Sequence, residues 1–475
     1  MSRKKQKFNV VIVGSGFSGI VAANILLDAG LDVLLIDENM HTGGQLLRKI
    51  PEKLGEYPGY RPDPVKKTGF GFVDSLRKKK IEILNRAIVI GIYPDNKILV
   101  EVDEKEVISV AYDVILFATG AREKFIPFKG WTLPGVYSTG LVQVLMKSSG
   151  VLPAERMVIG GSGLFLFAAA YEFLKNGGKV DAVLEQTPMF EKMKLLSQFF
   201  HQFSKFTEGA KYLLRIVLSG TAVRHRRKIV EARGEKALEE VVTARVNRAG
   251  RVIPGSEKIY KTGALAVGYG FTPNVELPQL AGCELEYAPG KGGWVVEVNR
   301  ELETGIENIF AAGEITGVGG ALKSITEGRM AAFAILKRLG KISGEEYSAK
   351  SKSLLRQRRR HLKFGEYFNL LYSIPGEMFL DIPGETVVCR CEDVTMDDIR
   401  KAVKHGYASP GSLKVAVRTG MGNCQGRICG PNVFEIISAL TGEPQRQVGR
   451  FSVRPPIKPV SIGSLAEYRD NGKSG

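Results

Sequence analysis

Short apolar runs alternate with helical patterns along the first part of the chain. A run of mostly β-branched residues at 8–13 is followed by a glycine-rich segment at 14–19, a helical pattern that ends near Gly30, and a second apolar run at 33–36. Parallel strands that are buried on both faces have continuous apolar sequences of this kind. The pattern therefore predicts a strand–helix–strand unit, with Asp37 at the end of its second strand.

The same pattern recurs further along the chain. An apolar run at 157–159 leads into a second glycine-rich segment at 160–163 and a helical pattern to about Lys175. A strand-like run at 180–184 then ends at Glu185. Two such units are typical of a chain with two nucleotide-binding domains.

Later apolar runs indicate how the two units are connected. Strands at 111–120 and 264–270 would close the units, and the run at 309–313 would return the chain to the first one. We therefore expect an α/β fold with two Rossmann-like dinucleotide-binding domains, one inserted in the other, and a small helical C-terminal domain. The expected divisions are 1–122 with 284–345 for the first domain, 123–283 for the inserted domain, 346–385 for a basic helical linker, 386–445 for the C-terminal domain and 446–475 for a proline-containing tail.

The composition is that of a globular protein with an excess of positive charge. Of the 475 residues, 44% are hydrophobic and 25% are charged, a balance that excludes disorder, collagen-like repeats and a coiled coil. The formal net charge is +17, and we expect the basic runs at 225–228 and 356–361 to be solvated faces, a contact with a partner subunit or an anion site. No nucleic-acid-binding motif accompanies them, so we expect no nucleic-acid partner.

The cysteines and the N-terminus indicate the cellular location of the protein. Cys283 is isolated and the other four cysteines lie between 389 and 429, unlike the spread of a disulfide framework. The sequence shows no signal peptide and no transmembrane segment. We therefore expect a cytoplasmic protein, with peripheral membrane association as an alternative, and we expect Cys283 to be a small packing residue.

The first glycine-rich segment has the spacing of a dinucleotide loop. Gly14 permits a tight turn, Gly16 lets the backbone approach a pyrophosphate, and Gly19 lets the helix pack closely on the strand. The diphosphate would lie at the N-terminus of the following helix, where unpaired N–H groups favour an anion. Asp37 is placed to accept hydrogen bonds from an adenosine ribose.

Three further segments are suited to a flavin dinucleotide. They are the glycine loop with Gly44 and Gln45, the strand end with Thr119 and Gly120, and the return segment with Gly313 and Glu314. Together these motifs resemble the two-dinucleotide-domain flavoproteins that include thioredoxin and glutathione reductases. The resemblance implies FAD, with Gly313 and Glu314 against its ribityl chain. Those reductases need a redox-active cysteine pair, which this chain lacks before residue 283, so we do not expect disulfide-reductase chemistry.

The second glycine-rich segment departs from the dinucleotide pattern. Gly161 and Gly163 hold the first two positions, but Leu166 replaces the third glycine and should push the helix away from the strand. Glu185 at the strand end would favour NAD over NADP. NAD, ATP, another nucleotide or no ligand all remain candidates for this site.

Four clustered cysteines can form one four-sulfur site. Cys389 and Cys391 are separated by 32 residues from Cys424 and Cys429, and four thiolates suit either zinc or a [2Fe–2S] cluster. We expect Thr395 to cap one short helix, and a second to begin at Pro431, so that two helices frame the site.

The cysteine segment resembles the [2Fe–2S] domain of the bacterioferritin-associated ferredoxin type. Its CxxxxC spacing departs from the CxxC of that ferredoxin but matches the version fused to FAD subunits of amino-acid and opine dehydrogenases. Their characteristic run is present from Arg418 to Cys429, with Val417 in place of the leading threonine. The resemblance favours [2Fe–2S] over zinc.

Residues 8–445 as a whole resemble the alpha subunit of the opine oxidase, hydrogen cyanide synthase and dye-linked proline or hydroxyproline dehydrogenase group. The resemblance implies a partner, a D-amino-acid-oxidase-like flavoprotein beta subunit that oxidises the amine, with a small third subunit and an FMN between subunits as further expectations. This chain would transfer electrons toward a quinone or a ferredoxin and would hold no catalytic residue for the amine. Two alternatives remain: a self-sufficient NAD(P)H-dependent FAD/[2Fe–2S] oxidoreductase, and a non-catalytic nucleotide-binding scaffold with structural zinc.

Overall fold

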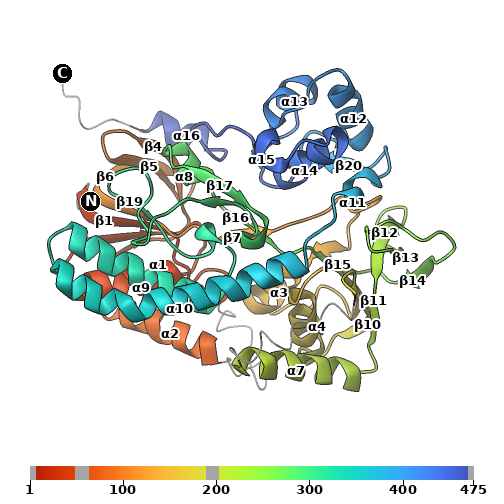
Figure 1. Ribbon diagram of the computed structural model, residues 1–475, viewed down its shortest axis with the longest axis horizontal. Coiled ribbons are helices and arrows are strands. Elements are labelled where there is room, and N and C mark those ends of the chain that lie inside the picture. The colour runs from red at the N-terminus through yellow and green to blue at the C-terminus, as the bar shows by residue number, and fades with distance from the viewer. Residues whose placement is uncertain (1–6, 49–63, 189–202, 469–475) are drawn as a thin grey trace.

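The computed structural model describes residues 7–48, 64–188 and 203–468. Figure 1 shows two α/β bodies side by side, with a group of short helices from the C-terminal part of the chain above them. The long helix α10 (Gly344–Leu371) runs along both bodies. In the described ranges, no helix is long and apolar enough to cross a membrane.

The first body is built on a seven-stranded sheet of order β3-β2-β1-β6-β5-β4, with β19 paired to β6. The buried apolar runs form the parallel strands β1 (Lys7–Val13) and β2 (Val33–Ile36), as predicted. The early half of β6 (Glu106–Phe117) pairs with β5 (Lys97–Val102) and its end pairs with β19 (Ile309–Ala311). The chain thus returns to this sheet almost 200 residues after leaving it. The remaining strands are β3 (Glu82–Leu84) and β4 (Ala87–Tyr93).

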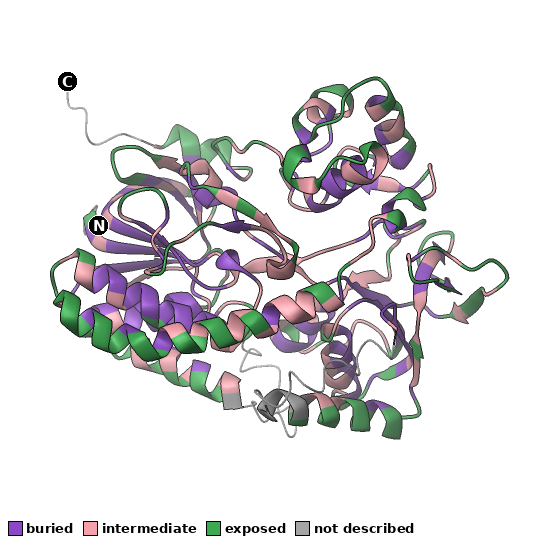
Figure 2. Ribbon diagram, viewed as in Figure 1, coloured by how far each residue is buried: buried purple, intermediate pink, exposed green. Residues whose placement is uncertain are grey.

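Helices α1 (Phe17–Asp28) and α9 (Ala321–Arg338) cover one face of this sheet, with α2 (Pro64–Arg77) alongside α1. A Cβ atom at Gly328 of α9 would lie 2.5 Å from the backbone oxygen of Ser18, so a glycine is needed where the two helices touch. Figure 2 shows both helices largely buried, whereas α10 is exposed along much of its outer side.

The second body has a five-stranded parallel sheet of order β11-β10-β9-β15-β8. Its strands are β8 (Val136–Ser138), β9 (Arg156–Gly161), β10 (Lys179–Glu185), β11 (Ala222–His225) and β15 (Leu265–Gly268). Helices α3 (Thr139–Val144), α4 (Phe165–Lys175) and α7 (Phe203–Leu218) accompany it. The predicted second strand–helix–strand unit is confirmed by β9, α4 and β10.

A separate three-stranded sheet was not foreseen from the sequence. It consists of β12 (Arg227–Arg233), β13 (Glu240–Arg245) and β14 (Lys258–Lys261). Short strand pairs connect the bodies: β7 (Ala121–Glu123) with β16 (Phe271–Pro273), and β17 (Leu285–Ala288) with β18 (Gly293–Val296). Helix α8 (Glu276–Leu280) lies between these pairs in the sequence. The domain divisions given above remain predictions.

The cysteine segment, residues 389–429, is framed by short helices. Thr395 forms a capping box with Asp398 and begins α12 (Met396–Lys404), and Gly442 ends α14 (Gly430–Thr441) in the left-handed conformation, as expected. Between them lies α13 (Pro410–Val417), which the sequence analysis did not predict. Helix α11 (Glu377–Leu380) and strands β20 (Val387–Cys389) and β21 (Val394–Thr395) precede them.

The C-terminal tail packs back on the first body. After α15 (Gln445–Val448), the Ile457 side chain is buried and its N–H donates to the Ile90 carbonyl of β4. Helix α16 (Ile462–Ala466) lies near β6. The tail therefore fixes the cysteine segment between two anchored stretches of chain.

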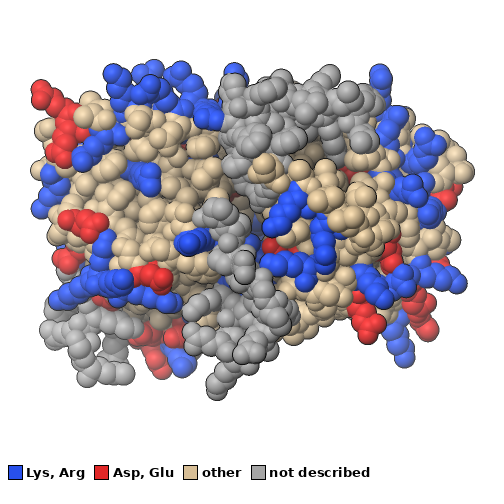
Figure 3. Space-filling model, turned by 90° about the horizontal axis from the view of Figure 1, so that it is seen from below, with Lys and Arg blue, Asp and Glu red and all other residues tan. Residues whose placement is uncertain are grey.

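Positive side chains outnumber negative ones on the face seen from below. Figure 3, which looks at the molecule from below, shows more Lys and Arg than Asp and Glu among the described side chains. Arg356, Arg359 and Arg360 of α10 are exposed, as expected for a solvated helix face. The same expectation is wrong for the run at 225–228, because Lys228 is buried and pairs with Asp381 at 3.6 Å.

Candidate functional site

The first glycine loop (residues 14–19) has the shape of a dinucleotide cradle. A Cβ atom at Gly14 would lie 2.2 Å from the Ala118 oxygen, and one at Gly19 would lie 2.0 Å from the Gly14 oxygen. At Gly16 a Cβ atom would meet nothing within 4 Å. Packing therefore explains Gly14 and Gly19, whereas Gly16 leaves open space where a pyrophosphate could approach.

Asp37 ties the end of β2 to this loop. Its Oδ2 atom accepts hydrogen bonds from the backbone N–H and the hydroxyl of Ser15, both 2.6 Å long. Its Oδ1 atom accepts from the backbone and side chain of Asn39, at 2.8 and 2.7 Å. The buried carboxylate is thereby fixed at the place expected for a ribose contact.

The other predicted flavin residues lie around the same edge of the sheet. Gly44 packs on the loop, since a Cβ atom there would lie 2.8 Å from the Gly16 Cα atom, while Gln45 is exposed and accepts from Arg48. The Thr119 hydroxyl donates to the Asn274 carbonyl at 2.7 Å, and Asn274 bonds the backbone of Thr119 and Gly120.

The return segment is held by the side chains of α9. The Glu314 Oε1 atom accepts from the N–H groups of Gly319 and Gly320 at 3.2 and 2.9 Å, so this carboxylate holds the loop that precedes α9. Burial raises the pKa of Glu314. The N–H of Gly313 donates to the Glu327 carboxylate at 2.9 Å, and its carbonyl accepts from the Lys323 ammonium. The contact with a ribityl chain stays a prediction for both residues.

A buried ion network beneath this segment was missed by the sequence analysis. Lys323 and Glu327 are 2.8 Å apart, and neither side chain has exposed surface. Arg358 of α10 reaches Glu327 at 2.8 Å. The only signal in the sequence was the spacing of four between Lys323 and Glu327, which is equally common on exposed helices.

The second glycine loop (residues 160–163) keeps its turn, and a Cβ atom at Gly163 would meet nothing within 4 Å, as at Gly16. A Cβ atom at Gly161 would lie 1.9 Å from the Gly268 oxygen, and the N–H of Gly163 donates to Glu185 at 3.2 Å. Glu185 has no exposed surface and also accepts from the Thr187 N–H at 3.0 Å. Leu166 is buried in the core of the second body. The Glu185 carboxylate therefore binds backbone N–H groups of the two adjacent loops.

The end of α10 covers this loop. The Ser162 hydroxyl donates to the carbonyl of Tyr372 at 3.2 Å. A little further on, the Gln186 side chain contacts the sulfur of Met378. Chain from the basic helix thus occupies the edge where a second nucleotide was expected.

The four clustered cysteines meet in space. The Cys429 sulfur lies within hydrogen-bonding distance of the sulfurs of Cys389 and Cys424, and the Cys391 thiol reaches Cys424. The hydrogen bond from Cys429 lowers the pKa of Cys389 to about 6. The same thiol is the main cause that lowers the pKa of Cys424 to about 5.

Backbone N–H groups surround these sulfurs. Gly420 and Glu392 donate toward Cys389, and Gly426 and Ile428 donate toward Cys424. Within the described residues, no three His, Cys, Asp or Glu side chains are placed to hold one metal ion together. The sulfurs instead form a chain from Cys391 through Cys424 and Cys429 to Cys389. The N–H donors around Cys389 and Cys424 favour the thiolate forms of these two cysteines.

Comparison with known families decides the class of the chain. Residues 8–332 match the family described as pyridine nucleotide-disulphide oxidoreductase, which covers the two sheets and both glycine loops. The chain belongs to the pyridine nucleotide-disulphide oxidoreductase family. Membership implies an FAD-dependent oxidoreductase. Residues 384–468 match a second description, the sarcosine oxidase A3 domain.

Curated relatives of this oxidoreductase are subunits of larger enzymes. It is 30% identical to a subunit of opine oxidase from Rhizobium meliloti, over 98% of this chain and 88% of that protein. It is 31% identical to the hydrogen cyanide synthase subunit HcnB of Pseudomonas protegens, over 96% and 97%. The relatives of this chain are therefore subunits of heteromeric enzymes.

A solved structure shares the fold over almost the whole oxidoreductase chain. The L-proline dehydrogenase from P. horikoshii superposes with a TM-score of 0.69 at 19% identity, covering 97% of this chain and 79% of that one. The expected α/β class is confirmed, including a helical C-terminal region.

Proposed function

We propose that this chain is the electron-transferring flavoprotein and iron–sulfur subunit of a heteromeric amine or amino-acid dehydrogenase or oxidase. The observation that carries the proposal is the meeting of four cysteine sulfurs in a chain whose relatives are named as oxidase subunits. Its substrate class would be that of proline, hydroxyproline, opines or glycine. Electrons would pass from a partner flavin subunit toward a quinone or a ferredoxin-type acceptor.

The first glycine loop and its neighbours would hold FAD. Gly16 leaves space for the pyrophosphate, and the fixed Asp37 carboxylate can accept from a ribose hydroxyl. The Gly313 segment is kept in place by Lys323 and Glu327, so the cradle is rigid before any ligand arrives.

The cysteine segment would hold a [2Fe–2S] cluster through Cys389, Cys391, Cys424 and Cys429. Such a cluster, when bound, transfers single electrons. The chain's own contribution is a set of backbone N–H groups that point toward the sulfurs of Cys389 and Cys424. Their N–H donors would stabilise the negative sulfurs.

A partner subunit is implied by the names of the relatives. We propose a D-amino-acid-oxidase-like beta subunit that carries the amine site, an FMN between the subunits, and a small third subunit. The exposed arginines of α10 supply a surface that would suit an acidic partner.

The self-sufficient NAD(P)H reductase is the less favoured alternative. The hydrogen bond from Ser162 to Tyr372 and the full burial of Glu185 give the second glycine loop and its acid protein partners in place of a nucleotide. A zinc scaffold would use the same cysteines, and metal analysis separates it from the redox proposal.

The proposal is tested by producing the chain alone and together with the proposed beta subunit. We expect substrate amino acids to bleach the flavin anaerobically only in the complex. Rapid bleaching of the isolated chain by NADH would contradict the proposal, as would a complex that no amine reduces.

A further inference from the structure

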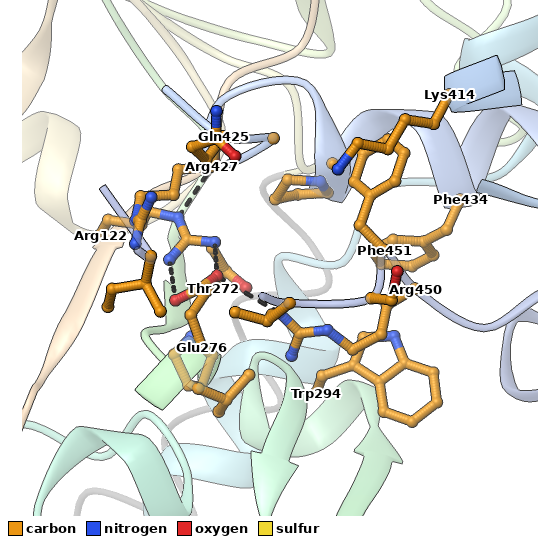
Figure 4. Close-up of a pocket in the computed structure, with 18 of the residues that line it drawn as sticks. Arg122, Thr272, Glu276, Trp294, Lys414, Gln425, Arg427, Phe434, Arg450 and Phe451 are labelled. Atoms are coloured by element: carbon orange, nitrogen blue, oxygen red, sulfur yellow. Dashed lines mark hydrogen bonds and ion pairs between the residues drawn. The ribbon is translucent and has the colours of Figure 1, made fainter. Parts of the chain in front are cut away.

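A pocket lies where the cysteine segment, α8 and the C-terminal tail meet. It has a cavity volume of about 80 Å³ and opens to solvent (Figure 4). One wall is aromatic, with Trp294, Phe434 and Phe451. The organic part of a ligand could therefore pack there while its polar group faces the other wall.

The other wall is strongly cationic. The lining residues include five cations and one carboxylate, namely Arg122, Lys414, Arg427, Arg450 and Arg454 with Glu276. In Figure 4, the side chains of Arg122 and Arg427 lie across the pocket from Lys414. Such an excess of positive charge in a partly closed space favours an anion.

The carboxylate of this wall, Glu276, already has arginine partners. Arg122 grips Glu276 with two hydrogen bonds, from Nη2 to Oε1 at 2.7 Å and from Nη1 to Oε2 at 3.1 Å. The Nη2 atom of Arg450 reaches the same Oε1 atom at 3.3 Å. Glu276 thus neutralises about one of the cations around it.

Two hydrogen-bond donors of the Arg450 side chain have no partner in the described part of the chain. Only 18% of its side chain is exposed, and its Nε and Nη1 atoms are shielded from solvent without a hydrogen-bond partner. The indole N–H of Trp294 is likewise shielded from solvent and has no hydrogen-bond partner. Lys414 lies on the same cationic wall and is partly exposed. Unpaired donors of a buried cation are costly, and an anion in the pocket would offset the uncompensated positive charge of Arg450.

We propose that this pocket binds the oxyanion group of a small ligand, a phosphate or a carboxylate, with Arg450 and Lys414 as its cationic contacts. The inference rests on the pocket alone and holds whether or not the cysteines bind a cluster. The pocket lies directly beside the cysteine loop, because Gln425, Gly426 and Arg427 line it. A bound anion would therefore lie next to the proposed redox centre.

The test is calorimetric titration of the full-length chain with inorganic phosphate and, separately, with acetate. Ionic strength is held constant with chloride, because phosphate also stabilises proteins non-specifically. We expect saturable binding of at least one probe, weakened about tenfold or more by Arg450→Gln and by Lys414→Gln. Phosphate alone would indicate a phosphate-bearing ligand, and acetate would indicate a carboxylate.

Arg446→Gln is the matched control, because Arg446 is an exposed arginine of α15 outside the pocket. It should bind like the wild type. Lys414 is partly exposed, so its variant decides the matter should Arg450→Gln fail to fold. Absence of saturable binding by either probe, or equal affinity in all variants, would overturn the proposal.

Discussion

The carbonyl oxygen of Tyr372, the residue that ends helix α10, accepts a 3.2 Å hydrogen bond from the hydroxyl of Ser162 in the second glycine loop. In an open dinucleotide site, that loop would face a pyrophosphate. Here it faces the protein's own backbone, and Glu185 beside it is fully buried.

This contact predicts weak nucleotide binding at the second sheet. We expect NADH and ATP to bind there with a dissociation constant above about 1 mM, because the loop and the acid have protein partners. Equilibrium titration of the FAD-loaded chain measures this. A micromolar affinity for NADH or ATP that is lost in Gly163→Trp would contradict this prediction, because it would show that a nucleotide binds at the second glycine loop.

Two glycines of the first loop should respond differently to alanine. Gly16→Ala should keep the stability of the protein and lose FAD, because a Cβ atom there meets no protein atom but enters the space left for the ligand. Gly19→Ala should destabilise the fold itself, since its Cβ atom would lie 2.0 Å from the Gly14 oxygen. Flavin absorbance and thermal unfolding of the apoprotein separate the two effects. Full flavin occupancy in Gly16→Ala would argue against the cradle.

The Lys323–Glu327 pair should contribute strongly to stability. Glu327→Gln leaves a buried ammonium and the guanidinium of Arg358 without their counter-charge, and we expect a loss of about 3–5 kcal/mol in the free energy of unfolding. Urea denaturation measures it.

The matched control is Glu346→Gln. Glu346 has the same spacing of four to Lys350, but both side chains are largely exposed. That change should cost less than about 1 kcal/mol. Equal losses for the two variants would mean that burial of the first pair has no energetic weight.

The Arg122–Glu276 pair predicts a dependence of stability on acid pH. Burial pushes the pKa of Glu276 upward, but Arg122 and, more weakly, Arg450 outweigh it and hold the pKa at about 2, against 4.5 for an unperturbed group. Because the pKa is lowered in the folded state, the stabilisation is complete above pH 4.5 and is lost as the pH falls toward 2. It amounts to at most about 3 kcal/mol.

Denaturation curves between these pH values test this, with Glu276→Gln as the reference. The variant should lose less stability over that interval than the wild type does. Parallel pH profiles for the two proteins would mean that Glu276 titrates normally.

Local patterns explain why part of the fold could be predicted. Continuous apolar runs specified β1 and β2, and Thr395 and Gly442 marked helix ends through their own side-chain and backbone chemistry. The glycine spacing of the first loop likewise reflects contacts within a few residues or with the neighbouring strand.

Contacts between distant segments could not be predicted in this way. Ser162 and Tyr372 are 210 residues apart, and nothing local to either indicates the other. The burial of Lys323 depends on how α9 packs, which a helical pattern does not encode. The contact of Arg450 with Glu276 likewise depends on how the C-terminal tail folds back, 174 residues further along the chain.

The identity of the group held by the cysteine segment is the central claim, and it is tested by iron and sulfide analysis with electron paramagnetic resonance of the anaerobically purified, dithionite-reduced chain. The account predicts iron and acid-labile sulfide in equal amounts and a low-temperature signal of a reduced [2Fe–2S] cluster. The signal should vanish in Cys424→Ser and persist in Cys283→Ser, because Cys283 is buried in the first body, outside the cysteine segment. Zinc in place of iron, or a signal unchanged in Cys424→Ser, would contradict the account.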